Sequence, residues 1–373
     1  MPRFAQMLAD GMRLRGHTVI VWAPEAKLSR LPAPRSLKKW LGYADQYIFF
    51  PAAVRRRIRS CPVDTLFAFT DQALGPWVPL LGSRPRVIHC HDFLAQRSML
   101  GEIPENPPGW TGQQYQAFIR RGYAQGQHFI SVSRRTQEDL HRFLPQQPVT
   151  SDVVYNGMNQ QIAPQEEQAA RHSLSQHLGL SLDTGYLLHV GGNHFYKNRV
   201  GVVEIYTAWR ATSTLALPLL LLGEAPNESL LAAHEKSPYK ADIHFLSGCA
   251  DEVVRTAYAG ASVFLFPSLA EGFGWPIAEA MASGCPVITT NEAPMTEVAG
   301  EAGFLVRRRP SEPTEVQTWA VEVAQVVAQV LALSKAARQA VVAQGLLNAK
   351  RFNTDAALDR IEEIYSAILA AKS

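Results

Sequence analysis

Two glutamates, Glu271 and Glu279, stand out in residues 266–290, which read FPSLAEGFGWPIAEAMASGCPVITT. Ionised carboxylates accept hydrogen bonds from hydroxyl groups. The glycines between the two glutamates let the backbone bend tightly or lie close to another molecule. Pro276 takes the place of a first helical residue, and the free N–H groups at a helix start attract phosphate. This combination predicts a site for a ligand that carries both hydroxyl groups and phosphate.

The same stretch predicts the elements that hold the site. An apolar run at residues 263–266 is typical of a buried strand, and residues 287–290 predict the next strand. Gly284 stands where the residue after a helix end is commonly glycine, so a short helix precedes it. The segment therefore reads as strand, glycine-rich loop, helix and strand. Two solvated glutamates in an ordinary α/β domain are the simpler alternative.

This ordered pattern resembles the donor-site signature of glycosyltransferase family 4, in which two glutamates flank seven residues, GFG follows the first and AMA-x-G-x-PV follows the second. The resemblance implies a GT-B fold, an α/β protein of two Rossmann-like, doubly wound domains that face a cleft. It also implies a sugar transferase that retains the anomeric configuration. By the same resemblance, Glu271 contacts hydroxyls of the transferred sugar and Glu279 holds the nucleotide ribose. The backbone of Phe273, Gly274 and Trp275 then lies against the sugar and the diphosphate.

A second glycine turn, GGNHFYKNR at residues 191–199, follows another predicted strand. Such a turn suits a phosphate cradle, and Lys197 supplies a positive charge for it, although a plain surface lysine is the alternative. Members of the family usually have an arginine where this chain has Gly192. We expect Arg199 or Asn193 to compensate for that departure.

His91 follows a predicted strand at residues 86–90 and resembles the family histidine that lies near the sugar at the cleft, with Asp92 placed to orient its imidazole. His89 and His91 would share a strand face, but no third ligand cluster is evident, so no metal site is predicted. Gly248 lies in a turn at which relatives bind the nucleotide base. The resemblance implies metal-independent catalysis with no cofactor, the nucleotide sugar being a co-substrate.

Length and composition are those of an ordinary globular protein. The 373 residues suit two domains of moderate size, and a net charge of +3 gives no sign of nucleic-acid binding. No apolar run approaches the roughly 20 residues that span a bilayer, and no signal-peptide pattern starts the chain. The four cysteines are scattered, which disfavours disulfides and a zinc site and predicts a reducing cytoplasm.

The expected domains follow from the resemblance. The N-terminal, acceptor-side domain takes in residues 1–157 together with 352–373, because the final helix of the family returns to the first domain. The donor-binding domain takes in residues 158–351, and the hinge lies at residues 156–159, NGMN. Residues 101–112, rich in proline, suit an acceptor-side lid. Glu297, in a TEVAG turn that relatives also carry, is expected to support the site.

The start of the chain departs from the family pattern. Residues 1–16 predict a helix and residues 17–22 a strand, which together are the second half of a strand–helix–strand unit. Relatives begin with a strand and a glycine-rich loop before a helix that ends in RGH, which residues 15–17 match. We therefore expect the N-terminal domain to lack its first, central strand, leaving two strand edges unpaired, and Met1 to be an internal methionine.

Positive charge gathers near the start. Residues 1–60 hold 12 Lys and Arg but 3 Asp and Glu, and aromatic residues are interleaved with the cations at residues 35–59. Basic and aromatic residues together can mark a surface that contacts a membrane. A solvated basic face over a local core is the alternative. The expected location is the cytoplasm, with peripheral contact at the inner face of the membrane.

The sequence thus predicts a glycosyltransferase with Glu271, His91 and Lys197 as catalytic residues. It would move a hexose from a UDP-, GDP- or ADP-linked sugar to a hydroxyl of a glycan or lipid-linked acceptor, in polysaccharide or cell-envelope glycan synthesis. A nucleotide-sugar 2-epimerase of the same fold and a non-catalytic GT-B subunit are the alternatives.

Overall fold

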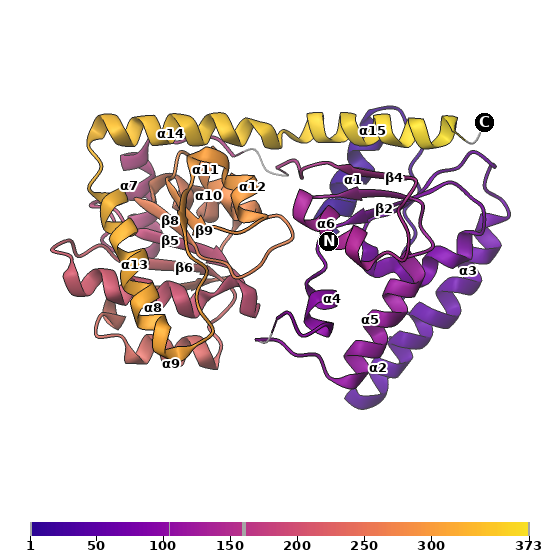
Figure 1. The fold of residues 1–373 in the computed structure, drawn as a ribbon, viewed down its shortest axis with the longest axis horizontal. Helices are drawn as coiled ribbons and strands as arrows, with labels where there is room; N and C mark the ends of the chain where they lie inside the picture. The colour runs from indigo at the N-terminus through magenta and orange to yellow at the C-terminus, as the bar shows by residue number, and fades with distance from the viewer. Residues whose placement is uncertain (1, 104, 159–161, 372–373) are drawn as a thin grey trace.

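The structure is a computed structural model that describes residues 2–103, 105–158 and 162–371. The chain forms two lobes, each a parallel sheet covered by helices, and a line of helix runs along one side of both (Figure 1). The predicted α/β architecture with two similar halves is confirmed.

The N-terminal lobe has a parallel sheet whose described strands follow chain order, β1-β2-β3-β4. The strands are β1 (Phe67–Phe69), β2 (Arg86–Cys90), β3 (His128–Ser131) and β4 (Thr150–Val153). The helical segments are α1 (Pro2–Leu14), α2 (Arg35–Ala44), the π-helical η1 (Asp45–Phe49), α3 (Phe50–Ile58), the 3-10 helix η2 (Gln72–Leu81), α4 (Leu94–Met99), α5 (Trp110–Tyr123) and α6 (Arg134–Phe143). The turns after β1, β2 and β3 meet at the carboxyl edge of this sheet.

The C-terminal lobe has a six-stranded parallel sheet in the order β10-β9-β8-β5-β6-β7. Chain order runs one way from β5 to β7 and the other way from β8 to β10, so the order reverses between β5 and β8. Sheets of this kind bind ligands at the carboxyl edge where the order reverses. The strands are β5 (Leu187–Gly191), β6 (Leu219–Gly223), β7 (Ile243–Ser247), β8 (Val263–Phe266), β9 (Val287–Thr290) and β10 (Phe304–Val306).

Helices cover both faces of this second sheet, because its strands are apolar on both sides. Strand β6 reads LLLLG, and its four leucines are buried. The α-helices of this lobe are α7 (Glu167–Leu178), α8 (Arg199–Thr212), α9 (Glu228–Lys236), α10 (Asp251–Gly260), α11 (Trp275–Ala282), α12 (Met295–Ala299), α13 (Pro313–Leu331) and α14 (Lys335–Ala349). The 3-10 turns are η3 (Phe195–Lys197), η4 (Lys240–Asp242), η5 (Gly300–Ala302) and η6 (Lys350–Phe352).

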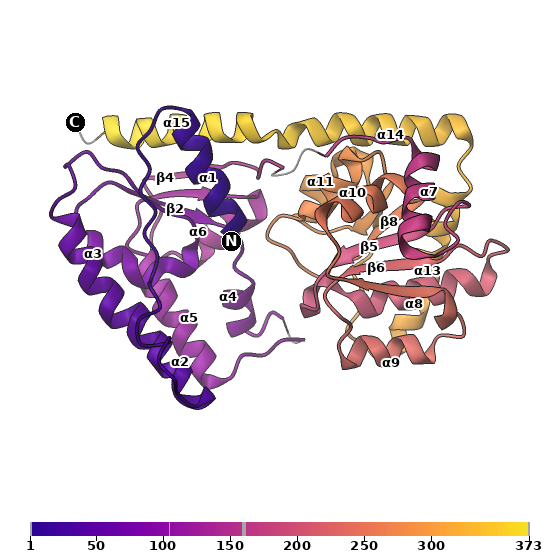
Figure 2. The ribbon, with the colours of Figure 1, turned by 180° about the vertical axis from the view of Figure 1, so that it is seen from behind.

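The last helix, α15 (Thr354–Ala370), ties the lobes together. It continues the line of α14 and crosses the N-terminal lobe, as both views show (Figures 1 and 2). Its residues Leu358 and Ile361 pack with Phe4 and Leu8 of α1 in one apolar cluster. Gly11 lets the two helices touch, because a Cβ there would lie 2.4 Å from Leu358. The final helix therefore packs against α1 of the N-terminal lobe, while the exact domain bounds stay a prediction.

The strand predicted at residues 17–22 is wrong. This segment is extended but joins no sheet, and β1 pairs with β2 alone among the described strands. A strand needs a neighbour that bonds its N–H and C=O groups, and no described strand pairs with this segment, although the Trp22 ring lies 5.6 Å from the Phe67 ring of β1. Side chains at its start and just before it bind α15 instead. Arg15 Nε lies 3.0 Å from Asp359 Oδ1, and His17 Nε2 lies 2.6 Å from Glu362 Oε1.

The boundary between residues 157 and 158 stays a prediction. The predicted hinge runs into residues 159–161, which lie outside the described residues, as do Met1, Pro104 of the predicted lid and the last two residues.

Among the described residues, no single helix is long and apolar enough to cross a bilayer, although α13 taken with the α14–α15 line passes on length and composition with a bend of 106°.

Candidate functional site

Lys197 and Glu271 meet at the point where the C-terminal sheet reverses. Lys197 ends the turn η3 after β5, and Glu271 lies in the loop after β8. The Lys197 Nζ atom lies 2.8 and 3.0 Å from the two carboxylate oxygens of Glu271. Glu271 is 9% exposed, and the lysine amine also faces the rings of Tyr196 and Phe266. Two predicted catalytic residues, remote in sequence, thus form one largely buried ion pair.

Hydrogen bonds between the two loops hold this pair in place. Asn198 adopts a left-handed conformation with φ of 51°. Its side chain donates to the Pro267 carbonyl (2.8 Å) and caps α8 through the Gly201 N–H (3.2 Å). The Leu269 N–H donates to the Tyr196 carbonyl at 2.7 Å. The β5 and β8 loops therefore form one rigid unit, which preorganises the charges of Lys197 and Glu271.

The glycine turn after β5 is braced by Glu224 and Arg199. One Glu224 oxygen accepts the Asn193 N–H at 2.9 Å, and the other would lie 3.1 Å from a Cβ at Gly192. Arg199 Nη1 donates to Asn193 Oδ1 (2.6 Å) and to the Glu224 carbonyl (2.9 Å). Arg199 is buried, and burial lowers the pKa of its guanidinium. The buried Arg199 thus holds the conformation of the glycine turn by hydrogen bonds. Gly192 leaves the surface of this turn free of a side chain.

Arg199 carries an unusual feature. Its Nε and Nη2 atoms are buried without a hydrogen-bond partner. Such groups are costly in a folded protein unless water or a ligand satisfies them. Arg199 is therefore a buried positive charge at this turn, and its compensation for the family arginine stays a prediction.

The start of α11 offers free backbone groups beside Glu271. Gly274 precedes the helix with φ of 105°, and no side chain caps the first turn. The helix begins at Trp275, so Pro276 is its second residue rather than the first. Phe273 is buried and packs its ring against Tyr155 and Trp275, so its backbone alone is available to a ligand. An open N-terminal turn of this kind attracts phosphate.

Glu279 projects from α11 and meets Tyr258 of α10. The Tyr258 hydroxyl donates to Glu279 Oε2 at 3.1 Å. Burial, and after it the Glu279 carboxylate, raises the pKa of that hydroxyl. Gly248 lies in the exposed turn that leads into α10, with φ of 69° and no atom within 4 Å of a Cβ built on it. Glu279, the predicted ribose residue, and Gly248, in the predicted base turn, therefore both lie beside α10.

His91 reaches the site through its backbone. A Cβ at Gly272 would lie 2.0 Å from the His91 carbonyl, so the two loops touch. The imidazole lies against the ring of Phe4, with Nε2 2.9 Å from the Thr70 carbonyl. Burial lowers the pKa of His91 to about 4, which keeps it neutral at neutral pH. Its ring nitrogen is thus already bonded inside the N-terminal lobe.

The expected role of Asp92 is wrong. Its Oδ1 atom accepts the Leu94 N–H at 3.1 Å at the start of α4, and the His91 imidazole bonds to Thr70 instead. Burial raises the pKa of the Asp92 carboxyl, and the nearby Asp71 and Glu271 add to the shift.

Glu297 joins the two lobes. Its carboxylate accepts the N–H groups of Arg134 (2.8 Å) and Arg135 (2.9 Å) at the start of α6. Beside it, the Ser133 hydroxyl donates to the Gly272 carbonyl at 2.8 Å. The C-terminal lobe thus caps a helix of the N-terminal lobe, next to the loop that carries Glu271.

A polar pocket of about 250 Å³ opens between the lobes beside Glu271. Arg308 crosses it, with Nη2 3.2 Å from Glu105 Oε1 and Nε 3.2 Å from the Leu269 carbonyl. The volume lies just below the roughly 300–1,000 Å³ typical of small-molecule pockets. The pocket is lined by Arg97, Glu102, Ile103, Glu105, Phe195, Leu269, Ala270, Glu292, Arg308 and Ser311. The described part of the predicted lid therefore borders a cavity next to the site.

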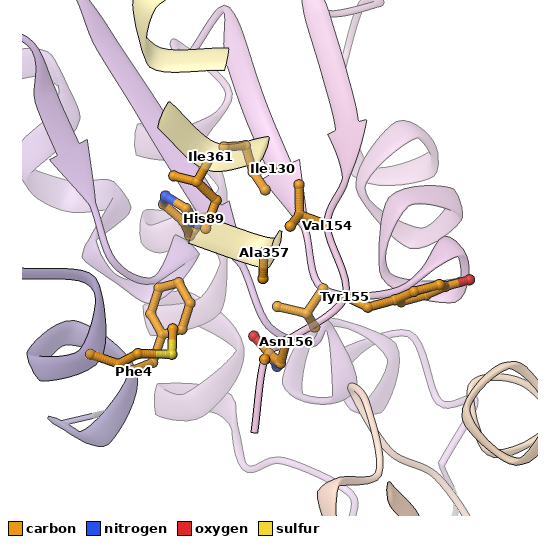
Figure 3. Close-up of a pocket in the computed structure, with 11 residues that line it drawn as sticks. Phe4, His89, Ile130, Val154, Tyr155, Asn156, Ala357 and Ile361 are labelled. Carbon is orange, nitrogen blue, oxygen red and sulfur yellow. The ribbon is translucent and has the colours of Figure 1, made fainter. Parts of the chain in front are cut away.

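A second cavity lies inside the N-terminal lobe, among Phe4, His89, Val154 and Ile361 (Figure 3). It has about 10 Å³ for a water-sized molecule, which is room for about one water. His89 bonds Tyr365 of α15 at 2.6 Å, and burial lowers the pKa of this histidine to about 3. This cavity is a packing defect and not a ligand site.

Sequence reasoning missed Glu224, Arg308 and Ser133. Each follows a strand at the carboxyl edge of its sheet, namely β6, β10 and β3. That position alone marks a residue as a site candidate in parallel sheets. Glu224 directly follows its strand, whereas Arg308 and Ser133 lie two residues after strand ends that only the structure defines.

Family models match parts of both lobes of the chain. A model described as Glycosyltransferase Family 4 matches residues 1–161, and one described as Glycosyl transferases group 1 matches residues 185–329. A curated relative, O-antigen chain mannosyltransferase B of Escherichia coli, is 30% identical over 171 residues, or 45% of this chain and 42% of that protein. The chain therefore matches less than half the length of this relative.

Solved structures show the fold. Sucrose-phosphate synthase from Thermosynechococcus elongatus superposes with a TM-score of 0.73 at 18% identity, over 99% of this chain and 93% of that one. Anabaena Alr3699/HepE, in complex with UDP and glucose, gives a TM-score of 0.67 at 19% identity, over 87% and 83%. The predicted GT-B fold is confirmed.

Proposed function

Because the chain belongs to the family 4 glycosyltransferases of the GT-B fold, we propose that it moves a hexose from a nucleotide-diphosphate sugar to a hydroxyl of an acceptor, with retention at the anomeric carbon. The observation that carries this proposal is the Lys197–Glu271 pair at the sheet reversal, beside the uncapped start of α11. One cation, one carboxylate and the N-terminal end of a helix without a side-chain cap converge there, which suits diphosphate and sugar hydroxyls together.

In this proposal the bound donor separates Lys197 from Glu271, and each residue contacts a different part of the donor. The diphosphate takes the Lys197 amine and the first turn of α11, and the sugar hydroxyls take the Glu271 carboxylate. Negative charge grows on the diphosphate as the glycosidic bond breaks, and fixed positive groups in a dry site stabilise it best. Glu279 accepts hydrogen bonds from the ribose, and the turn at Gly248 faces the base.

The same groups support donor binding without a divalent cation. Lys197 and the α11 N-terminus carry the positive charge that a metal ion would otherwise supply. Addition of EDTA should therefore leave turnover unchanged, whereas a stimulation by Mg²⁺ or Mn²⁺ would count against metal independence.

The pocket crossed by Arg308 is the proposed entry for the acceptor. Its carboxylates, Glu102 and Glu105, accept hydrogen bonds from sugar hydroxyls, and the Phe195 ring offers an apolar face to a sugar. An acceptor hydroxyl in this pocket approaches the donor on the side where Glu271 lies. A leaving-group oxygen of the diphosphate then takes the acceptor proton on the same face of the sugar. Retention follows from that geometry.

The names of related proteins suggest which donor and acceptor classes to test first. The curated relative is named for mannose transfer to O-antigen chains, and one structural neighbour was solved with UDP and glucose. We therefore propose a hexose donor and a glycan or lipid-linked acceptor of the cell envelope, with the reaction on the cytoplasmic side.

A thermal-shift screen of UDP, GDP and ADP sugars tests the donor. Selective stabilisation by one nucleotide class fixes it, because a ligand that binds the folded state raises its melting temperature. Release of nucleoside diphosphate that depends on an added acceptor supports transfer. An isomerised donor formed without acceptor would indicate a 2-epimerase, and no stabilisation by any nucleotide would indicate a non-catalytic subunit.

A further inference from the structure

Large apolar side chains of α2, η1 and α5 are exposed in the N-terminal lobe. The helices α2 and α5 lie side by side at one end of this lobe (Figures 1 and 2). Trp40 of α2 is 65% exposed and Trp110 of α5 is 72% exposed. We call this surface the lobe tip and define it by its exposed apolar residues, Leu37, Trp40, Ile48, Phe49, Trp110, Tyr115 and Phe118. Exposed large apolar residues that gather in this way mark an interaction surface.

The lobe tip is built as a rigid surface. Rings run in a chain from Trp40 to Tyr43 (5.9 Å), from Tyr43 to Tyr47 (6.1 Å) and from Tyr47 to Phe118 (5.9 Å). The hydroxyls of Tyr47 and Tyr115 lie 2.9 Å apart and join η1 to α5. The exposed rings therefore belong to packed helices and not to a free loop.

The charge around the lobe tip has one sign. Residues 26–63 hold nine Lys and Arg and one acid, Asp45, and residues 106–137 hold no acid at all. Asp45 is buried and accepts hydrogen bonds from the N–H groups of Lys27, Leu28 and Ser29. Its charge is therefore directed inward, and the solvent-facing charge of residues 26–63 is cationic.

The exposed apolar residues and positive charge of the lobe tip favour a membrane over a second copy of the chain or a nucleic acid. Two copies of the surface would bring like charges together, which opposes a symmetric dimer. Exposed Leu37 and Ile48 contribute nothing to a phosphate backbone, which argues against nucleic acid. Aromatic and aliphatic side chains among Lys and Arg are the pattern of helices that lie in an anionic membrane interface.

We propose that the lobe tip docks on an anionic bilayer surface, an interaction that goes beyond the sugar transfer proposed above. The tryptophans enter the interface, and Lys38, Lys39 and Arg55 meet the lipid phosphates. Trp110 lies five residues beyond Glu105, which lines the pocket crossed by Arg308. The chain between them leads from the membrane to the proposed acceptor entry, so a lipid-linked acceptor could reach the pocket while its tail stays in the bilayer.

Co-sedimentation with phosphatidylcholine vesicles, with and without phosphatidylglycerol, tests the proposal. We expect binding to the anionic vesicles that weakens as salt rises. The charge variant Lys38→Glu with Lys39→Glu should weaken it by about tenfold or more. The pair Trp40→Ala and Trp110→Ala should weaken it similarly and also reduce the binding that remains at high salt. Matched controls in the C-terminal lobe, Leu231→Ala and Lys236→Glu in α9, should bind like the unaltered chain.

Circular dichroism and the donor-induced thermal shift should be unchanged in the tip variants, which separates this proposal from the proposed transferase activity. The proposal is overturned if the unaltered chain ignores anionic vesicles or if the tip variants bind them as well as it does. It is also overturned if light scattering shows a dimer that the tryptophan variants dissociate, or if the charge variant loses DNA binding instead.

Discussion

The two sheets of this protein differ in how they serve the cleft between them. The C-terminal sheet reverses its order between β5 and β8, and the loops that leave this point carry Lys197 and Glu271 as side chains that face each other. The four described strands of the N-terminal sheet run in one order, and the turns after them meet the cleft mainly through backbone groups. The His91 carbonyl and the Ser133 hydroxyl touch the Gly272 loop, whereas the His91 ring turns inward.

The C-terminal lobe therefore holds Lys197 and Glu271, the charged pair of the site, and the N-terminal lobe positions the loop that carries Glu271. Substitutions of Lys197 and Glu271 should therefore change chemistry, and substitutions at the contact between the lobes should change docking and local stability. The following variants are ordered by the size of the effect that this comparison predicts.

Glu271→Ala should have the largest effect. It removes the carboxylate proposed to bind the sugar hydroxyls and leaves Lys197 without its partner, so both donor affinity and turnover should fall, the latter by about 10³-fold. Steady-state kinetics with saturating acceptor measure this. Glu322→Ala is the control, because it removes the carboxylate of an exposed ion pair with Arg307. Unchanged turnover in Glu271→Ala would remove the site assignment.

Lys197→Ala should mainly lower turnover, by about 10²-fold, because the leaving diphosphate loses its nearest cation. The control is Lys240→Ala, which breaks a surface pair with Glu235 at 2.6 Å. Exposed pairs contribute about 0–1 kcal/mol, so that variant should retain activity and stability. A Lys197→Ala enzyme that loses donor affinity but keeps its turnover would place the lysine in ground-state binding alone.

The C-terminal half of the site could be predicted from sequence because its chemistry is local. The loop that carries Glu271, the helix after it and the glycine after that helix occupy one continuous stretch, so spacing alone defined them. The pairing of Lys197 with Glu271 needed the sheet order, which no single stretch contains. The internal position of Arg199 also depends on Glu224 and Asn193, which come together only in the fold.

The N-terminal half was predicted less well for a physical reason. A strand is stable only beside a neighbour, so the apolar alternation of residues 17–22 could not reveal that no described strand pairs with it. The direction of the His91 ring depends on Phe4 and Thr70, which lie on other elements. The basic and aromatic composition of α2 was visible in the sequence, but the contribution of Trp110 and Phe118 appears only once α5 packs beside it.

Glu279→Ala should weaken nucleotide binding by roughly tenfold to a hundredfold, the cost of a lost hydrogen bond to a charged group. Calorimetric titration with the nucleoside diphosphate measures it. Turnover at saturating donor should stay near that of the unaltered enzyme, which serves as the internal control. Equal nucleotide affinity in the two proteins would contradict the ribose role.

Glu297→Ala tests how the N-terminal lobe docks. Its carboxylate caps α6 from the other lobe, so its loss should reduce stability by about 1 kcal/mol and loosen the contact between lobes. Urea unfolding and acceptor KM measure the two effects. Glu301→Ala, on the exposed turn η5, removes a carboxylate of the same region without the cap. If both variants unfold at the same urea concentration, the cap contributes nothing.

Asp45→Asn should have the smallest effect and one confined to the lobe tip. Burial alone would raise the pKa of Asp45, but hydrogen bonds from Leu28, Ser29 and Lys27 lower it from 3.8 to about 2. A carboxylate with a lowered pKa stabilises the folded state above pH 3.8, and this contribution is lost as pH falls through about 2.

The Asp45→Asn variant lacks this dependence of stability on pH. Protection of the amides of residues 27–29 against hydrogen exchange, measured relative to the intrinsic exchange rate at each pH, should therefore fall on acidification in the unaltered chain and should be low at every pH in the variant. Donor-induced stabilisation at neutral pH should be equal in the two proteins, because the tip is separate from the Lys197–Glu271 pair. A loss of donor binding in Asp45→Asn would mean that the lobes are coupled more tightly than their different use of side chains and backbone implies.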